Sequence, residues 1–528
     1  MKEACMLGKA VETQKLSCAA AVKCLLLMLA VLSVLNLAML PPLGFENDRT
    51  STWPSPIEER QNFNAMNSGK EALLEMKENE NVIESAESST TQPSVPSDQG
   101  QDEAPSKTES ISTELSVSSN QEQDQATSNS DSPAQNTGII CEFSNYRYNM
   151  CSIEVNLKVM GSSATVLLIP PSYTTPADTS TVWKIRPFTR KWEEVTMDHV
   201  RELTIQWASN QNQGPACDVI HDVPVLIFAT EGFPFNLFHD YTDLLIPLFV
   251  AANQYNGKIQ FAVTNFHGPW INKYMPHLQA LSHYPIINLD SETLVHCFPS
   301  GQVGLRATFP MTVDNYSAQN VSTMVGFRNF VRSSLSLERT LVDITDQKNS
   351  NKKPRIAILL RKVTRTFTNE NEIVEMAKGV GFEVVRVDPE TTKDFPRIAH
   401  LINSCDVLMG LHGAGLTNMM YLPNNGTLIQ VLPWGDLRFI SWKDFGEPTK
   451  YMGLNYIEYE IKEEESTLIE KYPRNHTVFT NPQELHKQGW TAMSSVYLVE
   501  QSVKLDVNRF RGVLVDLFNS LTQQTRKK

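Results

Sequence analysis

Between residues 355 and 432, short apolar runs alternate with stretches of helical periodicity, and this alternation restricts the fold more than any other feature of the chain. The apolar runs predict strands, and the amphipathic stretches predict helices. The predicted order is strand Arg355–Leu360, helix Asn371–Gly379, strand Phe382–Val387, helix Asp394–Asn403, strand Asp406–Gly410 and strand Thr427–Leu432. Strands that alternate with helices imply a parallel sheet with right-handed crossovers, so the chain is expected to be α/β.

The sequence His412-Gly413-Ala414-Gly415 joins one of these strands to a helix that is predicted to start near Leu416. Glycines let the backbone approach a ligand closely, and the N–H groups and dipole at a helix start favour an anion. His412 adds a hydrogen-bond donor at the carboxyl end of the strand. We expect this loop to bind a phosphate or diphosphate, although the same glycines would suit any tight turn between a strand and a helix.

The preceding part of the chain shows a weaker version of the same pattern. It predicts strands at Ala164–Ile169, Val223–Ala229 and Ile259–Val263, and a helix at Leu237–Ala252. The chain is therefore expected to form two facing Rossmann-like lobes, residues 139–345 and residues 346–528, with a cleft between them. Ligands of open parallel sheets bind at the carboxyl ends of the strands, where the His412 loop is expected.

Two further helices are predicted outside these alternating segments. A helix at Ser322–Asp343 is expected to link the lobes, and a C-terminal helix at about Val499–Leu521 is expected to pack back across the first lobe.

The N-terminal region predicts a membrane anchor. Residues 24–40 are almost wholly apolar, and with residues 19–22 they approach the roughly 20 residues that span a bilayer. Residues 1–23 contain four lysines and two glutamates, so this tail is expected in the cytoplasm and the rest of the chain in the lumen. A cleaved signal peptide would begin in the same way, but no small-x-small cleavage site is evident near Leu40, which favours an uncleaved signal anchor.

Residues 41–138 are predicted to be a disordered lumenal stem. Residues 51–138 contain 16 acidic and four basic side chains and almost no aromatic or β-branched clusters, so they cannot bury enough apolar surface to fold. This segment carries most of the formal net charge of −13. The folded part is near neutral, which argues against a nucleic-acid partner.

Asparagines and cysteines agree with a lumenal location. N-glycosylation sequons occur at Asn315, Asn320, Asn425 and Asn475, and Asn425 is close in sequence to the predicted anion-binding loop. An oxidising lumen permits disulfides, for which Cys141 with Cys151 and Cys217 with Cys297 are the candidate pairs. Cys405 is expected to be a free thiol in the core, and no cysteine spacing resembles a zinc site.

Two arginines lie where they could bind a diphosphate. Arg361 directly follows a predicted strand, and Arg365 lies four residues later in a polar loop. Two guanidinium groups could clamp a diphosphate and stabilise a leaving nucleotide, although loop arginines are often merely solvated.

His239, Asp240 and Asp243 lie at the start of the helix predicted in the first half. His239 and Asp243 are four residues apart and share a helix face, so the carboxylate could orient the imidazole as a general base. The acidic residues also suit the first turn of a helix as caps, and both interpretations can hold together.

Several motifs are missing after the stem. There is no Asp-x-Asp pair, which metal-dependent sugar-nucleotide enzymes commonly use, and neither a Gly-x-Ser-x-Gly elbow nor a Walker loop. The role of neutralising a diphosphate therefore falls to Arg361, Arg365, His412 and the helix dipole, without a metal or another cofactor.

Together these residues resemble glycosyltransferase family 61, over most of residues 141–521. The motifs that carry the resemblance are Cys141 and Cys151; Lys184-Ile185-Arg186-Pro187 with Arg190-Lys191; Asn236-Leu237-Phe238-His239-Asp240 with Asp243; Cys297-Phe298; Arg361, Arg365 and Asn369-Glu370; the run from His412 to Asn418; Pro433-Trp434-Gly435; and the run from Tyr456 to Tyr459.

The resemblance implies a type II Golgi membrane protein with two GT-B-like Rossmann domains that transfers a sugar from a nucleotide donor with inversion. It implies that His412 to Gly415, Arg361 and Arg365 hold the donor, and that His239, Asp240 or Asp243 supplies or orients the base. Family members from grasses add arabinofuranose or β-1,2-xylose to xylan. The expected partners are a UDP-pentose donor, a xylan acceptor and the Golgi membrane, with either a homodimer or a polysaccharide-synthesising complex as the assembly.

The chain departs from the family pattern before the His-Asp motif. Family members often have Gly-Gly-Tyr-x-Gly-Asn, whereas this chain has Glu231 and Phe235 in place of two of the glycines, on a loop expected to line the acceptor side. Ser502 also replaces a common acidic residue after Gln501.

These departures leave the identity of the acceptor or donor open more than the type of reaction. Two alternative functions remain. One is β-1,2-xylosyl transfer to N-glycan cores or to another polysaccharide. The other is a non-catalytic Golgi scaffold of a polysaccharide-synthesising complex.

Overall fold

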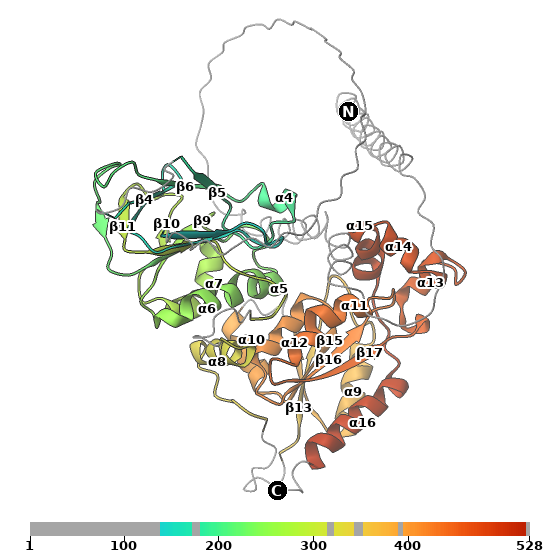
Figure 1. Cartoon of the computed structure of the whole chain (residues 1–528). Helices are drawn as coiled ribbons and strands as arrows, with labels where there is room; N and C mark the ends of the chain where they lie inside the picture. The colour runs from blue at the N-terminus through green and yellow to red at the C-terminus, as the bar shows by residue number, and fades with distance from the viewer. Residues whose placement is uncertain (1–137, 172–179, 314–321, 343–351, 389–393, 524–528) are drawn as a thin grey trace, which may run out of the picture. The chain divides into compact units, whose positions relative to one another are not determined.

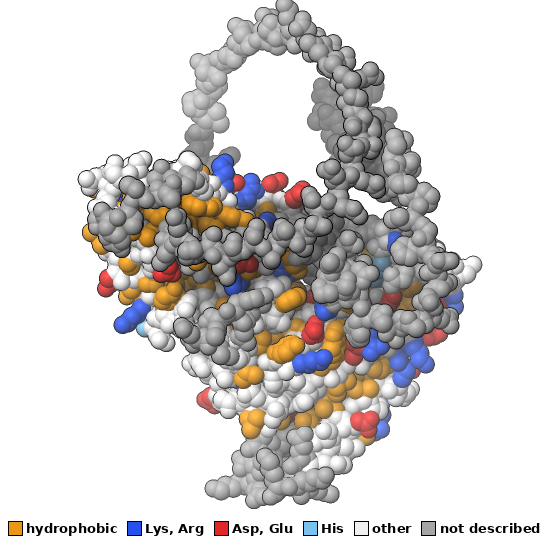
Figure 2. All heavy atoms as spheres, viewed as in Figure 1, with side chains coloured by type: hydrophobic (Ala, Val, Ile, Leu, Met, Phe, Trp, Pro, Cys, Tyr) orange, Lys and Arg blue, Asp and Glu red, His pale blue; other side chains and the backbone are white. Residues whose placement is uncertain are grey.

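The computed structural model describes residues 138–171, 180–313, 322–342, 352–388 and 394–523 (Figure 1). The predicted tail (1–23), anchor (24–40) and stem up to residue 137 lie outside these residues, as do Asn315 and Asn320. No helix among the described residues is long and apolar enough to span a membrane. Figure 2 shows Lys and Arg side chains interspersed with Asp and Glu side chains on the visible face, in keeping with the near-neutral charge of this part.

A five-stranded parallel sheet lies in the second half of the chain, and it contains the four strands that the sequence predicted and a fifth that it did not. Its strand order is β14 (Glu383–Val387), β13 (Arg355–Leu359), β15 (Val407–Leu411), β16 (Thr427–Leu432) and β17 (Asn455–Glu460). Every residue of β15 and β16 is buried, as expected for central strands covered on both faces. The predicted helices are also present, as α9 (Glu370–Val380) and α10 (Phe395–Asn403).

The prediction for the C-terminal helix was wrong in its start and in its packing partner. Helix α16 (Val507–Gln523) packs beside α9 on the second-half sheet (Figure 1) and not on the first half. Its buried residues Phe510, Leu514, Leu517 and Leu521 repeat at helical spacing and join the cluster formed by α9 and β13. Periodicity revealed an apolar face, but it carried no information about which apolar surface that face would cover.

The first half contains two six-stranded mixed sheets where the sequence predicted one Rossmann-like sheet. The first sheet has the order β1 (Ile139–Glu142), β2 (Met150–Ile153), β12 (Gly301–Val303), β8 (Val225–Ala229), β9 (Gln260–Thr264) and β10 (Ile287–Asn288). Its last four strands are parallel, and they include two of the three predicted strands. The described residues thus form a mixed α/β fold in which both halves contain parallel neighbouring strands.

The third predicted strand of this half, β4 (Thr165–Leu168), belongs to the other sheet. That sheet has the order β5 (Val182–Ile185), β6 (Leu203–Trp207), β4, β3 (Leu157–Met160), β11 (Val295–Phe298) and β7 (Val219–Ile220). Antiparallel neighbours predominate in it, and its strands are only two to five residues long, which gives a weak sequence signal.

The predicted helix near residue 237 is interrupted by a π-helical turn. It consists of α5 (Leu237–His239), the π-helical segment η1 (Asp240–Leu245) and α6 (Ile246–Ala252). Asn236 caps it by accepting a hydrogen bond from the N–H of Phe238. π-Helical turns are frequent at functional sites, and this one contains two of the predicted catalytic residues.

The predicted linking helix is shorter than expected. Helix α8 (Met324–Ser334) is capped by Thr323 and ends before Ser336, whose φ of 54° is incompatible with a continuing helix. The fully buried Arg328 fixes this helix to the second half by donating to the carbonyl groups of Leu422 and Met452.

Both predicted disulfides are present. Cys141 pairs with Cys151, its directly opposed residue in the β1–β2 ladder, and Cys217 pairs with Cys297. Cys405 is a buried free thiol, as predicted, and burial raises its pKa to about 11.

Asn425 and Asn475 are exposed. Asn425 lies just before β16, at the amino edge of the parallel sheet, whereas His412 lies at the carboxyl edge. A glycan on Asn425 would therefore project from the edge opposite the predicted donor site.

Candidate active site

The His412 loop lies at the carboxyl end of β15, where the sequence predicted an anion site. Gly413 has a φ of 146°, which a residue with a side chain rarely adopts. The helix that follows is a 3₁₀ helix, η3 (Ala414–Tyr421), and not the predicted α-helix. Its first N–H groups still lack helical partners, so the loop keeps the donors that an anion requires.

Arg361 and Arg365 converge on this loop, as predicted. A Cβ atom added to Gly413 would lie 3.0 Å from Nη1 of Arg365 and 3.1 Å from Nη1 of Arg361. Arg361 is held by the carbonyl and hydroxyl oxygens of Thr364, at 2.8 and 2.9 Å. Arg365 donates to the carbonyl of His412 at 3.2 Å. Both guanidinium groups therefore lie beside Gly413, and hydrogen bonds fix their orientations. This arrangement suits a clamp that binds a diphosphate through two guanidinium groups.

A hydrogen-bond chain that sequence reasoning missed orients His412. The side chain of Tyr456 donates to Oε1 of Gln430 at 2.8 Å, and Nε2 of Gln430 lies 2.8 Å from Nδ1 of His412. Burial, assisted by Glu458, raises the pKa of Tyr456, so its hydroxyl stays protonated and donates. The amide then donates to Nδ1, which leaves the proton of the neutral imidazole on Nε2 as a hydrogen-bond donor.

The sequence alone could have indicated that Gln430 has a special role. It is a fully buried polar residue inside the apolar run of β16, and a buried amide requires partners.

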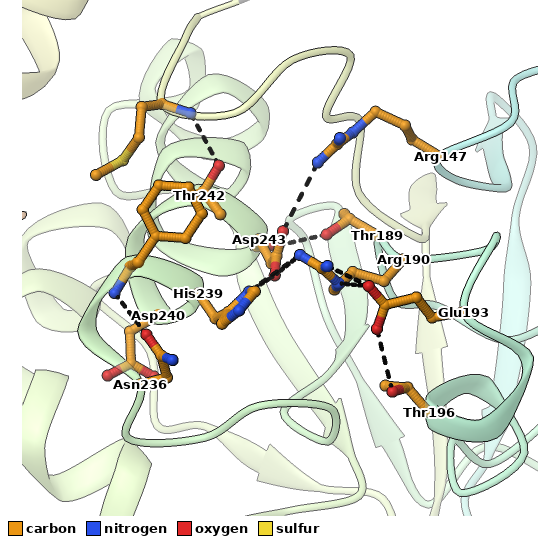
Figure 3. Close-up of polar contacts among 12 residues, drawn as sticks. Arg147, Thr189, Arg190, Glu193, Thr196, Asn236, His239, Asp240, Thr242 and Asp243 are labelled. Atoms are coloured by element: carbon orange, nitrogen blue, oxygen red, sulfur yellow. Dashed lines mark hydrogen bonds and ion pairs between the residues drawn. The ribbon is translucent and has the colours of Figure 1, made fainter. Parts of the chain in front are cut away.

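His239 and Asp243 form the predicted pair on one helix face (Figure 3). Nδ1 of His239 lies 2.8 Å from Oδ2 of Asp243, and their side chains are 3% and 0% exposed. The ring of Phe233 stacks on His239 at a centroid distance of 4.5 Å.

Arg190 completes this cluster, and neither it nor its partner Glu193 was assigned a role from the sequence. Nη1 of Arg190 lies 3.0 Å from Nδ1 of His239 and 3.4 Å from Oδ2 of Asp243, while its Nε donates to Glu193 at 2.9 Å (Figure 3). Arg147 approaches the other oxygen of Asp243 at 3.9 Å. Arg190 and Arg147 lie far from Asp243 in the sequence, so local spacing could not reveal them.

The charges around Asp243 determine the tautomer of His239. Burial alone would raise the pKa of Asp243, but Arg190, His239 and Arg147 together lower it below its ordinary value. The carboxylate is therefore ionised and can only accept, while the guanidinium of Arg190 can only donate. Because the carboxylate makes the shorter contact, the proton of the imidazole lies on Nδ1, and Nε2 becomes the basic nitrogen.

Asp240 has a different environment from its neighbours. Its Oδ1 accepts from Nε1 of Trp270 at 2.8 Å and from the N–H of Phe235 at 3.0 Å. Its Oδ2 accepts from Tyr274 at 2.5 Å and from Lys273 at 3.1 Å. A fully buried carboxylate with four donors is well suited to anchor the loop before α5.

Aromatic rings link the cluster that contains His239 to the loop that contains His412. Phe238 packs edge-on against His239 and, at 5.7 Å, against Phe445. Phe445 in turn packs edge-on against His412 at 5.9 Å. The predicted base and the predicted donor loop are thus separated by two side chains.

A polar pocket of about 290 Å³ lies elsewhere in the first half. Its lining residues are Asn149, Lys184, Arg186, Lys191, Glu194, Met197, Asp198 and Glu202. Lys184 pairs with Glu202, Arg186 pairs with Asp198, and Lys191 donates to backbone carbonyls. Because these cations already have partners, the pocket is a weaker diphosphate site than the His412 loop. Among the described residues, no group of three or more His, Cys, Asp or Glu side chains could hold a metal ion.

Comparison with known proteins gives a family and several relatives. Residues 237–429 match the sequence profile of the family described as Glycosyltransferase 61. An alpha-1,3-arabinosyltransferase of Oryza sativa subsp. japonica is 39% identical over 393 residues, which cover 74% of this chain and 66% of the rice protein. A beta-1,2-xylosyltransferase of the same plant is 36% identical over 393 residues, which cover 72% and 84% of the two chains.

A xylan glycosyltransferase of Arabidopsis thaliana is 32% identical over 392 residues, which cover 72% of this chain and 79% of that protein. The chain thus matches just under two thirds of the rice arabinosyltransferase and a larger share of the other two relatives.

Proposed function

Because the chain belongs to glycosyltransferase family 61, we propose that it transfers a pentose, arabinofuranose or xylose, from a UDP-sugar to xylan with inversion. The names of the relatives include an arabinosyltransferase and a xylosyltransferase, and a third names xylan. The observation that carries the proposal is the convergence of Arg361 and Arg365 on Gly413.

The donor diphosphate would bind at the His412 loop. Arg361 and Arg365 would neutralise its charge, and Nε2–H of His412 and the N–H groups of Gly413, Ala414 and Gly415 would donate to its oxygens. These groups would also stabilise the charge that develops on the leaving UDP as the bond to the sugar breaks.

His239 would act as the general base. Its Nε2 would take the proton of the acceptor hydroxyl while that oxygen attacks the anomeric carbon from the face opposite UDP. The bond between the anomeric carbon and the phosphate oxygen then breaks, and its electron pair leaves with UDP. Asp243 would hold the ring and stabilise the imidazolium that forms, and Asp240 would position the loop.

We assign this reaction to the Golgi lumen and to two facing Rossmann-like domains of the GT-B type, residues 139–345 and 346–528. The two disulfides support an oxidising compartment. The parallel strands of both halves support the assignment of domains.

The test is a donor panel assayed on the purified full-length chain in detergent. UDP-arabinofuranose, UDP-xylose and other UDP-sugars would be offered with xylan oligomers or N-glycans. Arg361→Ala and His412→Ala should abolish transfer, while Arg474→Ala, which removes an exposed arginine paired with Glu463 and Glu464, should not. Full activity of both site variants would refute the donor site, and transfer to N-glycans alone would refute the acceptor.

A further inference from the structure

Phe235 combines two features that rarely occur together in a phenylalanine. Its φ is 72°, and 39% of the residue is exposed. A bulky residue with positive φ is a backbone outlier, and strain of this kind persists only where the surroundings enforce it. Glycine would adopt this positive φ without strain. The chain therefore has a strained left-handed backbone at the position that presents an exposed aromatic ring.

The backbone of the loop is held on both sides of Phe235. Gly232 has a φ of 110°, and a Cβ atom there would lie 2.4 Å from the ring of Phe188. The N–H of Phe235 donates to the buried carboxylate of Asp240 at 3.0 Å. Asn236 then caps α5. The conformation is fixed by contacts that do not involve the phenylalanine ring.

The exposed ring of Phe235 has neighbours that fix its orientation. The ring of His267 lies 5.0 Å away at 77°, and Nζ of Lys273 lies 5.7 Å from the centroid of the ring. Lys273 is paired with Asp240 at 3.1 Å, so its charge is largely balanced. The ring thus offers a preorganised apolar surface beside a neutralised cation, which suits a neutral ligand better than an acidic one.

The loop is adjacent to the proposed base. Phe233 covers one face of His239 from within the protein, and Phe235, two residues later, is exposed to solvent. Asp240, the residue after His239 in the chain, anchors the N–H of Phe235. A ligand that lies on this ring is therefore close to the segment that carries His239.

We propose that Phe235 is a specificity-determining residue that stacks on a sugar ring of a neutral glycan acceptor. One face of a pyranose presents C–H groups, and such a face packs on an exposed aromatic ring in an oriented manner. The inference rests on the proposed function, because it takes the acceptor of that reaction as its ligand.

The test compares Phe235→Gly with Phe235→Trp in the full-length chain. Phe235→Gly should fold, because it relieves the backbone, and the KM for xylan oligomers should rise roughly 10-fold with little change in the KM for the donor. Phe235→Trp should retain the acceptor KM within about threefold, because it retains a stacking surface. Tyr451→Ala is the matched control, since Tyr451 is also an exposed aromatic residue but lies near the amino edge of the second-half sheet.

Hydrolysis of the UDP-sugar without acceptor would be measured in parallel. If the wild type neither transfers nor hydrolyses the donor, the proposed function fails. If the wild type transfers to xylan and the acceptor KM of Phe235→Gly is unchanged, the role of Phe235 fails alone. If Phe235→Gly lowers only kcat and leaves both KM values unchanged, the result also contradicts stacking on the acceptor.

Discussion

The hydroxyl oxygens of Tyr241 and Tyr421 lie 2.5 Å apart in a hydrogen bond that is buried completely. Tyr241 lies in η1, two residues after the proposed base, and Tyr421 is the last residue of η3, which starts at the His412 loop. This bond therefore joins the helix that carries His239 to the segment that carries His412. Burial raises the pKa of both phenols, so both remain protonated.

Replacement of one of these tyrosines by phenylalanine leaves the other hydroxyl buried without its partner. Tyr241→Phe and Tyr421→Phe should each destabilise the protein by about 1–2 kcal/mol, whereas the double variant should lose clearly less than the sum. Thermal unfolding of the four proteins gives the coupling. Strict additivity would show that the hydrogen bond contributes nothing.

Asp243→Asn should lower kcat by roughly 100-fold or more without a comparable change in the KM for the donor. The amide can donate to Nδ1 of His239, which would move the proton to Nε2 and remove the base. A histidine that serves only in packing would show the same burial, so the pH profile of kcat decides between the roles. Asp516→Asn, on the exposed face of α16, is the control, and a wild-type profile in Asp243→Asn would exclude the catalytic role.

Gly413→Ala should raise the KM for the donor at least about 10-fold, because the new methyl group would displace the guanidinium groups of Arg361 and Arg365 and strain a φ of 146°. The matched glycine is Gly512 in α16, where a Cβ atom meets nothing within 4 Å. Gly512→Ala should leave the kinetics unchanged and stabilise the protein by about 0.5–1 kcal/mol. An unchanged donor KM in Gly413→Ala would contradict the clamp.

His277 should make the protein less stable in mild acid. The side chain is fully buried against Tyr274 and Phe395, its Nδ1 lies 2.6 Å from the hydroxyl of Ser334, and burial lowers its pKa to about 4. Because the unfolded chain binds the proton first, stability is complete above the unfolded pKa of 6.5 and falls as the pH decreases towards 4. The loss should reach about 2 kcal/mol at pH 5.

Thermal unfolding between pH 7.5 and pH 4.5 measures this slope. In His277→Gln the amide can still bond to Ser334 but does not titrate, so the slope should be smaller. An equal slope in the variant would assign the acid sensitivity to other groups.

Four strands of the second-half sheet could be predicted, because the central ones are buried on both faces and their sequences are apolar runs. The edge strand β17 is mostly half-buried and polar, and it was not predicted. Of the sheet that contains β3 and β4, only β4 could be predicted, because the strands are two to five residues long and their pairing depends on contacts far apart in the sequence. The His239–Asp243 pair could be found from its spacing of four residues. Arg190 contacts His239, which is 49 residues away in the sequence, and such a contact can be seen only in the folded structure.

The tight winding of η3 determines how far the chain travels between the two edges of the sheet. Eight residues of 3₁₀ helix rise roughly 16 Å, against roughly 12 Å for an α-helix. A five-residue strand such as β15 is itself roughly 17 Å long, so η3 can carry the chain back to the start of β16 almost directly. The length of η3 thus fixes the distance between Gly413, at the proposed donor site, and Tyr421. One residue more or fewer would shift one end by roughly 2 Å and separate the two phenols.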